Sequence, residues 1–580
     1  MSISGLYFAG TGTNLYSLTR SGSAGFTLTG YATTIGLETG DSNAVAIGAE
    51  NTSGTNTISS VPIVLAPASG STSTIYQAGG GTLVITGTIS GAANLTKTGA
   101  GTLTLSGANT YSGDTTIGAG VLLLGNASAI PSGTGKGDVV VGSGGTLSTG
   151  DTNFSINGLS GSGLVQKTSS AGVADGGNPD TITIGNNDAD GSFSGVLQGS
   201  VSGHELNIIK TGTGTQTFSG TNTYAGTTSI QNGTLSINTI KNLSTSSAIG
   251  APTTAANGTI AIGSGATGAT LKYTGSGDTT NRIIDLAGTT GGATIDQSGT
   301  GLLKFTSNLA ATGGGDKTLT LQGSTAGSGE ISGIIKDNSS SNITSVSKAG
   351  TGAWTLSGVN TYTGTTTISG GTLAIGAAGT NTGGSINTTS SIAVNGGGTL
   401  LLNGDGSGVA TTRVKDTAAI SLAGGTIKTS GASEFTGGTF AAPTGVGLGA
   451  LTLTANSKLD FDGTKGLLAF GGFSDPSNFT LTIDNYIGAG GSTGLDRLIF
   501  AFANQTAADA SLPDFAFTYD GTTVAAADTF IGNGLWEITP ITAVPEPSTW
   551  IGGSLALAAL AFSQRRRILS KLNSRLAVSR

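Results

Sequence analysis

The sequence of 580 residues predicts an all-β protein whose main part is a solenoid, a stack of coils built from short strands. One segment recurs three times in the same frame. Within each copy, apolar residues alternate with hydroxylated ones, which is the period of a strand. Glycine accounts for 102 residues and charged residues for only 9%, which indicates turns and uncharged strands. No stretch before residue 550 shows the period of an amphipathic helix.

The repeat is visible in three segments that align without a gap. They read LTKTGAGTLTLSGANTYSGDTTIGAGVLLLG at 95–125, IIKTGTGTQTFSGTNTYAGTTSIQNGTLSIN at 208–238 and VSKAGTGAWTLSGVNTYTGTTTISGGTLAIG at 346–376. Their shared frame is K-x-G-x-G-x-x-T-x-S-G-x-N-T-Y-x-G-x-T-x-I. Compositional bias alone cannot produce so many matched columns. The frame aligns three residue types: Lys97, Lys210 and Lys348; Tyr111, Tyr224 and Tyr362; Ile117, Ile230 and Ile368.

The strands within a copy are predicted from the alternation of side chains. In GTLTLSG, Leu103 and Leu105 alternate with Thr102 and Thr104, so one face of the strand is apolar and the other carries hydroxyls. Short strands at this spacing fit both a sandwich array and a solenoid. We favour the solenoid because each unit is too small to bury its own apolar face. In such a stack, we expect the Asn and Thr residues at matched positions to form ladders.

The charge balance and the absence of cysteine exclude several classes of function. Residues 1–546 carry 18 basic and 31 acidic side chains, and the six remaining basic residues all follow Glu546. An acidic body of this kind does not bind nucleic acid through clustered Lys and Arg. A chain with no cysteine forms neither disulfides nor thiolate metal sites.

The three copies resemble the autotransporter-associated β-strand repeat, also called the passenger-associated transport repeat, of large bacterial surface proteins. The similarity lies in the G-T-L-T-L-S-G-x-N-T-Y-x-G-x-T-x-I core. The resemblance implies a right-handed parallel β-helix in an exported protein, and it implies no catalytic activity. A self-contained autotransporter also needs a C-terminal run of lipid-facing strands, which is not visible in this sequence.

We expect four regions along the chain. Residues 1–88 form an N-terminal β region that caps the solenoid, and 89–449 form the β-helix with its three repeats. Residues 450–540 form a smaller C-terminal β-domain, because aromatic and acidic residues become more frequent there. It would close the end of the stack, since an open sheet edge invites aggregation. Residues 541–580 form a sorting segment with one short transmembrane helix.

Candidates for chemistry are few, and we expect no cofactor. A Ser-His-Asp catalytic triad would require the single histidine, His204, and the sequence around it contains no nucleophile elbow. Asn186, Asp188 and Asp190 occupy the first, third and fifth positions of a calcium-type loop. Because the twelfth position is Leu197 and no helices flank the loop, these residues are only a weak calcium candidate, and an acidic turn is the simpler interpretation. The three aligned lysines suggest solvated or turn-capping side chains, with contact to an anionic polysaccharide as the alternative.

The C-terminal segment AVPEPSTWIGGSLALAALAFSQRRR combines three features. Two prolines stiffen the approach, an apolar run at 550–562 follows, and Arg565, Arg566 and Arg567 close it. The run is short for a membrane-spanning helix, which needs about 20 residues. A thinner bilayer and an interfacial Trp allow a short span with the basic tail on the cytoplasmic side. The predicted span includes Trp550, Leu555, Leu557, Leu560 and Phe562.

This segment resembles the PEP-CTERM sorting signal, which a membrane exosortase handles. By that resemblance, Pro545, Glu546 and Pro547 are the recognition motif and the arginines are the basic stop. The tail after Arg567 is longer than is usual for this signal. Export also requires an N-terminal signal, which the first 20 residues do not show, and we expect a start codon further upstream.

The sequence therefore predicts a non-catalytic, exported β-helix protein of the cell surface or extracellular matrix, attached to a membrane through its C-terminus. We expect a structural or adhesive role, an exosortase-type protease as one partner, and an association with exopolysaccharide. The alternative is a surface-displayed polysaccharide-active enzyme of the β-helix lyase type. Clustered Asp, Lys or Arg side chains on adjacent coils would favour that alternative.

Overall fold

The computed structural model describes residues 27–29, 35–37, 45–49, 55–59, 62–65, 72–77, 79–167, 179–199, 205–488, 496–519 and 522–541. The chain divides into two compact units, each described by itself below. The N-terminal unit comprises residues 1–373 and 388–390, and the C-terminal unit comprises 374–387 and 391–580.

The described residues of the N-terminal unit form strands and one helical turn, α1 (Ala255–Gly258). Its strands are β1 (Thr27–Thr29), β2 (Ile35–Leu37), β3 (Val45–Ala49), β4 (Thr55–Ser59), β5 (Ile63–Leu65), β6 (Thr72–Gln77), β7 (Thr82–Ile85), β8 (Ile89–Gly91), β9 (Asn94–Thr98), β10 (Thr102–Leu105), β11 (Thr115–Leu124), β12 (Val139–Ser148), β13 (Phe154–Ile156), β14 (Leu159–Gly161), β15 (Leu164–Gln166), β16 (Asp180–Ile184), β17 (Gly191–Phe193), β18 (Val196–Gln198), β19 (Leu206–Lys210), β20 (Thr215–Phe218), β21 (Thr228–Ile230), β22 (Gly233–Ile237), β23 (Ile260–Ile262), β24 (Ala269–Tyr273), β25 (Asp278–Thr280), β26 (Ile284–Leu286), β27 (Ala293–Gln297), β28 (Leu302–Phe305), β29 (Ala310–Ala311), β30 (Lys317–Gly323), β31 (Ser328–Ile331), β32 (Thr344–Lys348), β33 (Ala353–Leu356) and β34 (Thr366–Ile368).

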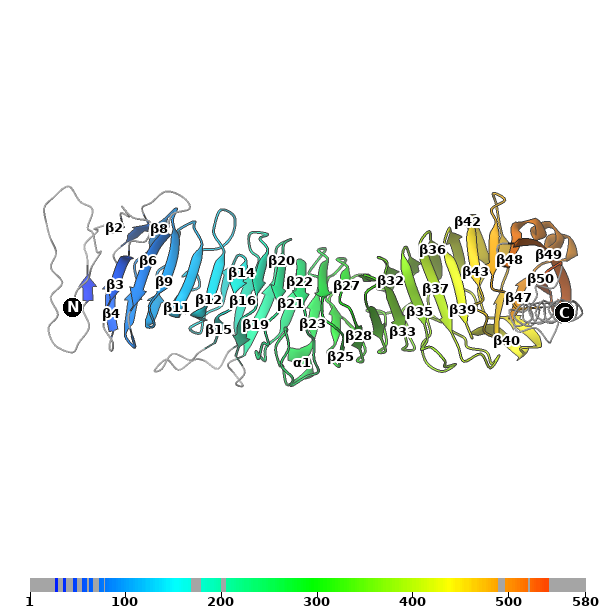
Figure 1. The fold of residues 1–580 in the computed structure, drawn as a ribbon, viewed down its shortest axis with the longest axis horizontal. Coiled ribbons are helices and arrows are strands. Elements are labelled where there is room, and N and C mark those ends of the chain that lie inside the picture. Colours follow the sequence, from blue (N-terminus) through cyan, green and yellow to red (C-terminus); the bar gives the residue numbers. More distant parts are fainter. Residues whose placement is uncertain are drawn as a thin grey trace, which may run out of the picture. The chain divides into compact units, whose positions relative to one another are not determined.

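The strands of the N-terminal unit pair in parallel with the equivalent strands of the neighbouring coils, so that successive coils lie side by side (Figure 1). The side chains alternate between the inside and the outside of the coil. Leu83, Leu103, Leu122 and Leu147 occupy one register position on β7, β10, β11 and β12, and all four are fully buried. Such inward columns form the core of each coil and supply its main stabilisation through apolar burial.

The C-terminal unit contains parallel strand pairs and ends in antiparallel strands. Strand β35 (Gly371–Ile375) includes the last residues of the first segment of the N-terminal unit and the first residues of the C-terminal unit. The other elements of the C-terminal unit are β36 (Ser391–Asn395), β37 (Gly398–Asn403), β38 (Ala419–Ala423), β39 (Thr426–Ser430), β40 (Ser433–Thr439), β41 (Ala442–Val446), β42 (Leu451–Ala455), β43 (Ser457–Asp460), β44 (Gly466–Phe470), β45 (Phe473–Ser474), β46 (Leu481–Asp484), β47 (Asp496–Ala501), α2 (Gln505–Ser511), η1 (Leu512–Asp514), β48 (Phe515–Tyr519), β49 (Thr522–Gly532) and β50 (Leu535–Pro540).

Parallel pairing crosses residue 450, since β38 pairs with β42 and β39 with β43. Strand β40 pairs antiparallel with β41, and a larger antiparallel group lies near the end of the unit, where β49 lies between β48 and β50, and β50 also pairs with β47. Phe470 stacks on Phe500 with ring centroids 5.0 Å apart, and Phe515 lies 5.3 Å from Phe500. The aromatic residues that distinguish this stretch of sequence therefore pack against one another.

The prediction of a mostly-β fold with stacked parallel strands, as in a β-solenoid, is confirmed. The right-handed sense of the coil and the four-region division stay predictions. Two short helices were not predicted. Their first turns are capped by Thr254 and Asn504, whose side-chain oxygens accept the amides of Asn257 and Ala507. These caps stabilise helices too short to produce a periodic apolar face.

The described residues contain no helix long and apolar enough to cross a membrane. The expected span at 550–562 lies outside these residues.

The C-terminal unit contains a buried carboxyl group, and the ionisation of this group makes the stability of the unit depend on pH. Glu434 in β40 is fully buried, and burial raises its pKa to about 7, although bonds from the Thr411 hydroxyl and the Arg413 amide act in the opposite direction. The folded form therefore binds the proton more tightly than the unfolded chain, whose pKa is about 4.5. The stability that Glu434 contributes is fully present below about pH 4.5 and is lost as the pH rises through about 7.

We accordingly expect the amides of β40 to exchange hydrogen more slowly at pH 5 than at pH 8, after correction for intrinsic exchange rates. Glu434→Gln should reduce this difference. Burial also raises the pKa of Asp496 to about 7, so part of the pH dependence should persist in the variant. Equal corrected protection of β40 at both pH values in the unmodified protein would contradict the prediction.

Candidate functional site

The shared lysine of the three repeats is the first candidate, and it is buried in every copy. Lys97, Lys210 and Lys348 are each at most 1% exposed. Lys97 is the penultimate residue of β9, and Lys210 and Lys348 are the last residues of β19 and β32. Each ammonium group donates to three backbone carbonyl oxygens. The acceptors are Thr98 (2.9 Å), Gly99 (2.7 Å) and Ala119 (3.0 Å) for Lys97; Thr211 (2.6 Å), Gly212 (2.9 Å) and Asn232 (3.3 Å) for Lys210; and Ala349 (2.7 Å), Gly350 (3.0 Å) and Gly370 (2.9 Å) for Lys348.

The local sequence K-x-G builds this carbonyl cage. The glycine two residues after each lysine has a positive φ, 77° at Gly99, 69° at Gly212 and 65° at Gly350, a conformation that glycine adopts without strain. The resulting turn directs two carbonyls at the ammonium group, and the next coil supplies the third. An ammonium group has three donors and no acceptor, so the cage uses its full capacity. Burial lowers the pKa of each of the three lysines to about 8.

The turn-capping interpretation of these lysines is therefore confirmed, whereas the solvated one is wrong. Contact with an anionic polysaccharide is also wrong for these three side chains, because their ammonium groups are buried inside the coil.

The shared asparagine of the NTY motif joins one coil to its neighbours. In the first copy, the Asn109 side chain accepts from the Ile89 amide at 2.7 Å and donates to the Ala129 carbonyl at 2.7 Å. In the second copy, Asn222 makes the equivalent bonds to Leu197 at 2.8 Å and Ala248 at 2.6 Å.

Asn360 of the third copy accepts from the Ile335 amide at 2.9 Å. The expected ladder of matched asparagines is thus wrong. The copies are separated by other coils, and each asparagine bonds the backbone around it instead.

The shared tyrosine and threonine form a third internal contact. Tyr111 bonds Thr115 at 2.6 Å, Tyr224 bonds Thr228 at 2.8 Å and Tyr362 bonds Thr366 at 2.7 Å, each hydroxyl to hydroxyl. All three tyrosines are buried, and burial raises the pKa of each phenol. The shared lysine and asparagine therefore bond neighbouring coils, whereas the tyrosine contact stabilises the turn within its own copy.

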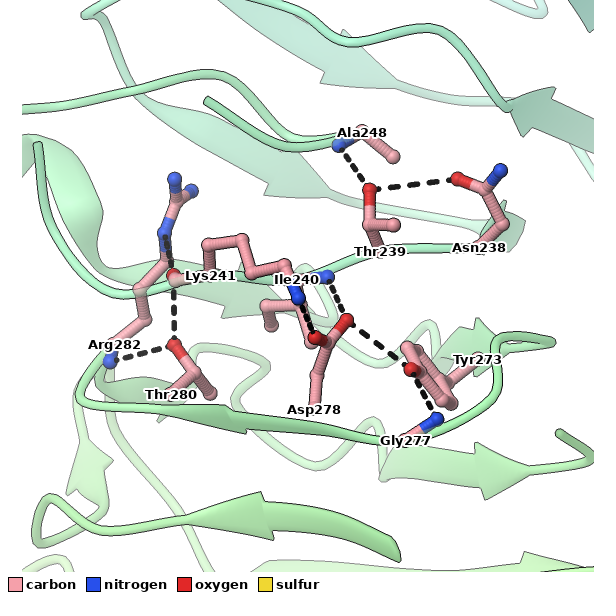
Figure 2. A network of polar contacts seen from close by, with 10 residues as sticks. All are labelled: Asn238, Thr239, Ile240, Lys241, Ala248, Tyr273, Gly277, Asp278, Thr280 and Arg282. Carbon is pink, nitrogen blue, oxygen red and sulfur yellow. Dashed lines mark hydrogen bonds and ion pairs between the residues drawn. The ribbon is translucent and has the colours of Figure 1, made fainter. Parts of the chain in front are cut away.

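Figure 2 shows a charged cluster on neighbouring coils, the feature that would favour an enzyme. Asp278 accepts from the Lys241 ammonium group, from the Ile240 amide at 2.9 Å and from the Tyr273 hydroxyl at 3.1 Å. The Arg282 guanidinium donates to the carbonyls of Ile249 at 2.6 Å and Gly250 at 2.7 Å.

The Asp278 side chain is only 3% exposed and Arg282 is 2% exposed. Both oxygens of Asp278 are engaged, and burial is the main cause that raises the pKa of Tyr273 to about 12. The cluster fastens the 238–250 loop to the next coils, and it leaves no carboxylate in position to act as a general base.

The calcium candidate residues form a turn on the outside of the N-terminal unit. Asp188 and Asp190 each accept a backbone amide of the next coil, that of Thr213 and that of Thr215, both at 2.6 Å. Asn186 instead donates to the Ser132 hydroxyl at 3.2 Å, and both residues line a depression of about 410 Å³.

The described part of the chain contains no group of three His, Cys, Asp or Glu side chains that could hold a metal. The acidic turn has a structural use, and calcium binding there stays a prediction.

Several sequence candidates lie outside the described residues. They are His204, the motif residues Pro545, Glu546 and Pro547, the predicted span at 550–562, and Arg565, Arg566 and Arg567.

Comparisons with known proteins agree with the repeat assignment. Residues 95–124, 208–237 and 346–375 match the family described as Passenger-associated-transport-repeat, which confirms the three repeats predicted from the sequence. The chain is also 32% identical, over 277 residues, to the adhesin BmaC autotransporter of Brucella suis biovar 1 (strain 1330). The match covers 47% of this chain but only 8% of that adhesin. The chain therefore contains autotransporter-associated repeats and is distantly similar to an adhesin.

Sequence reasoning missed the buried charges of the C-terminal unit. Arg413 donates to the carbonyls of Asn403 and Gly384, both at 2.9 Å, and Arg497 pairs with Glu537. These residues occur once each, outside any repeat, so no alignment between copies could reveal their burial. The asparagine and tyrosine contacts, by contrast, were signalled by their fixed place in the frame.

Proposed function

We propose that this protein is an exported, non-catalytic β-solenoid of the cell surface or extracellular matrix, with a structural or adhesive role. The observation that carries the proposal is the internal use of the repeat motif. The lysine and asparagine of the frame bond neighbouring coils, and the tyrosine bonds a threonine within its own copy, so the repeats provide length and rigidity rather than a reaction centre. Similarity to an autotransporter adhesin supports the surface role.

The proposal includes attachment through the C-terminus. Pro545, Glu546 and Pro547 would be read by an exosortase-type membrane protease, 550–562 would span the membrane during sorting, and the three following arginines would stop transfer. The order of stiff segment, apolar run and basic cluster in the sequence supports this step. An association with exopolysaccharide follows from the same location.

The lyase-like alternative is weaker because the charged side chains of the cluster around Asp278, which meet on adjacent coils, bond to one another and to backbone groups. Figure 2 shows the bond between Asp278 and Lys241 and the bond from the Arg282 guanidinium to the Lys241 carbonyl. A β-helix lyase requires a basic or calcium-bound acidic cluster open to its substrate.

The test is to fractionate cells that make the protein, to digest intact cells with protease, and to determine the mature C-terminus by mass spectrometry. We expect the solenoid to be cut on intact cells and the C-terminal tail to be missing from the surface fraction. Deletion of the gene should reduce attachment of the cells to a surface. An intact Arg580 on a protease-protected protein in the cytoplasmic fraction would overturn the proposal.

A further inference from the structure

The outer face of the N-terminal unit carries a continuous column of hydroxyl groups, which we call the hydroxyl ladder. One residue on each of seven successively paired strands, from β20 to β34, occupies the same register position. The members of the hydroxyl ladder are Thr215, Thr234, Thr270, Thr294, Thr320, Ser347 and Thr367. Each is half-buried and lies next to an inward-facing apolar or capping residue, so all seven side chains face out.

Among the described residues, these hydroxyls have no hydrogen-bonding partner, unlike the buried threonines of the repeats. The buried Thr115, Thr228 and Thr366 bond to tyrosines, whereas none of the hydroxyl groups of the ladder makes a side-chain hydrogen bond among the described residues. Seven aligned hydroxyls thus remain available to a ligand.

The alignment is kept although the chain between its members varies in length. The step from Thr215 to Thr234 is short, and the step from Thr234 to Thr270 includes α1 and a long loop, yet both pairs are in register. Parallel strands lie about 4.8 Å apart, so the hydroxyl ladder spans roughly 29 Å with an even spacing. That spacing is comparable to the length that one pyranose ring adds to an extended polysaccharide.

A second polar column runs beside the hydroxyl ladder, two residues further along the strands and so about 6.7 Å away. Its members are Thr217, Ser236, Lys272, Asp296 and Gln322, of which Ser236 is buried and the other four are half-buried. Lys272 and Asp296 are register neighbours of opposite charge, and Gln322 donates to Asp296 at 3.2 Å. The two columns together present donors and acceptors without a net charge.

We propose that the hydroxyl ladder is the docking track for one chain of a neutral, linear polysaccharide laid along the stack of coils. This inference rests on the proposed adhesive function and assigns its partner and its site. Neutral polymers are favoured because the hydroxyl ladder has no charge and residues 1–546 carry 31 acidic but only 18 basic side chains, which repel an anionic chain.

Each hydroxyl bond to sugar replaces a bond to water, so a single contact is weak. In a rigid row of seven hydroxyl groups, every contact with the polysaccharide after the first is intramolecular. The affinity should therefore increase with the length of the polymer.

The experiment measures retention of the full-length protein in native gels that contain linear β-1,4-glucomannan, linear β-1,3-glucan or alginate. The ladder variant is Thr270→Val, Thr294→Val and Thr320→Val, which keeps the branched shape that suits a strand. The matched control is Thr399→Val, Thr426→Val and Thr482→Val, in a column of the C-terminal unit that Lys458 interrupts. A third variant replaces the same three ladder threonines with serine and so keeps the hydroxyls.

We expect at least one neutral polymer to retain the unmodified protein, and alginate not to do so. The ladder variant should bind at least tenfold more weakly, while the control and the serine variant stay within about threefold of the unmodified protein. Circular dichroism and the unfolding midpoint verify that each variant folds.

Equal retention of the ladder variant, stronger binding to alginate, or no retention by either neutral polymer would each overturn the inference. Cells that still attach to a surface in that case would leave the proposed function standing. Absence of the protein from the cell surface would instead refute the proposed function.

Discussion

Replacing Arg497 with Met should destabilise the C-terminal unit by about 3 to 5 kcal/mol, the range found when one partner of a buried ion pair is removed. Arg497 bonds Glu537 with two parallel contacts of 2.9 and 3.0 Å and also donates to the Phe440 carbonyl at 2.6 Å. Both side chains of the pair are 2% exposed. The variant would leave a buried carboxylate and a buried carbonyl without their donor, which is costly in a low-dielectric interior.

The effect should be local to the antiparallel end of the unit, because Arg497 lies on β47 and Glu537 on β50, which pair with each other. Hydrogen exchange measured on peptides from these two strands should accelerate on the order of a hundredfold or more. Loosening of β50 also exposes strand edges, so we expect the variant to aggregate at lower temperature.

Two further variants test the cause of this loss. The double variant Arg497→Met and Glu537→Leu should recover most of the stability, since an apolar replacement of the whole pair removes the unpaired charge. Lys458→Met breaks the exposed pair with Asp484 on the same unit and should cost less than about 1 kcal/mol. A single variant as stable as the unmodified protein would contradict a stabilising role of the buried pair.

Replacing Lys348 with Met should destabilise the third repeat by about 2 to 4 kcal/mol. The three carbonyl oxygens of Ala349, Gly350 and Gly370 lose their donor, and each unmet bond to a charged group costs about 1.5 to 3 kcal/mol. Release of the buried charge offsets part of the loss. Faster hydrogen exchange in β32 and β34, the strands that the cage joins, is the measurement.

The control is Lys336→Met, which removes an exposed ammonium group of the same unit and should change stability by less than about 0.5 kcal/mol. The same substitution at Lys97 and Lys210 provides two internal replicates, because their cages have the same three-carbonyl form. Unchanged exchange in all three variants would show that the cage adds nothing to the stack.

The repeating part of the fold could be predicted from the sequence because its signals are local. Alternation such as that of Leu103 and Thr104 sets the inward and outward faces, and K-x-G fixes the turn that forms the cage. The frame also pointed to Lys97 and Tyr111 as structural residues, although it could not show that Lys97 is fully buried. Burial depends on the carbonyl of Ala119, which the next coil supplies.

Features that depend on register could not be predicted. The hydroxyl ladder joins Thr234 to Thr270 across an irregular loop, and the sequence contains no fixed period that would align them. The buried pair of Arg497 and Glu537 likewise arises only when β47 and β50 meet in antiparallel order. The sequence suggested that the repeat lysines are solvated or cap turns, the first because charged side chains usually lie on the surface. In the structure, their ammonium groups lie inside the coils and donate to backbone carbonyls.

We conclude that the side chains of the repeat motif face inward and stabilise the stack of coils rather than bind a ligand. Amine labelling of the folded protein with an N-hydroxysuccinimide ester at pH 8, analysed peptide by peptide, tests it most directly. Lys97, Lys210 and Lys348 are each at most 1% exposed and donate to three backbone carbonyls, so the reagent should not reach their amines in the folded protein. We predict that they stay unlabelled while the exposed Lys336 is modified, and that all four react after unfolding. Labelling of the repeat lysines at the rate of Lys336 in the folded protein would contradict this conclusion.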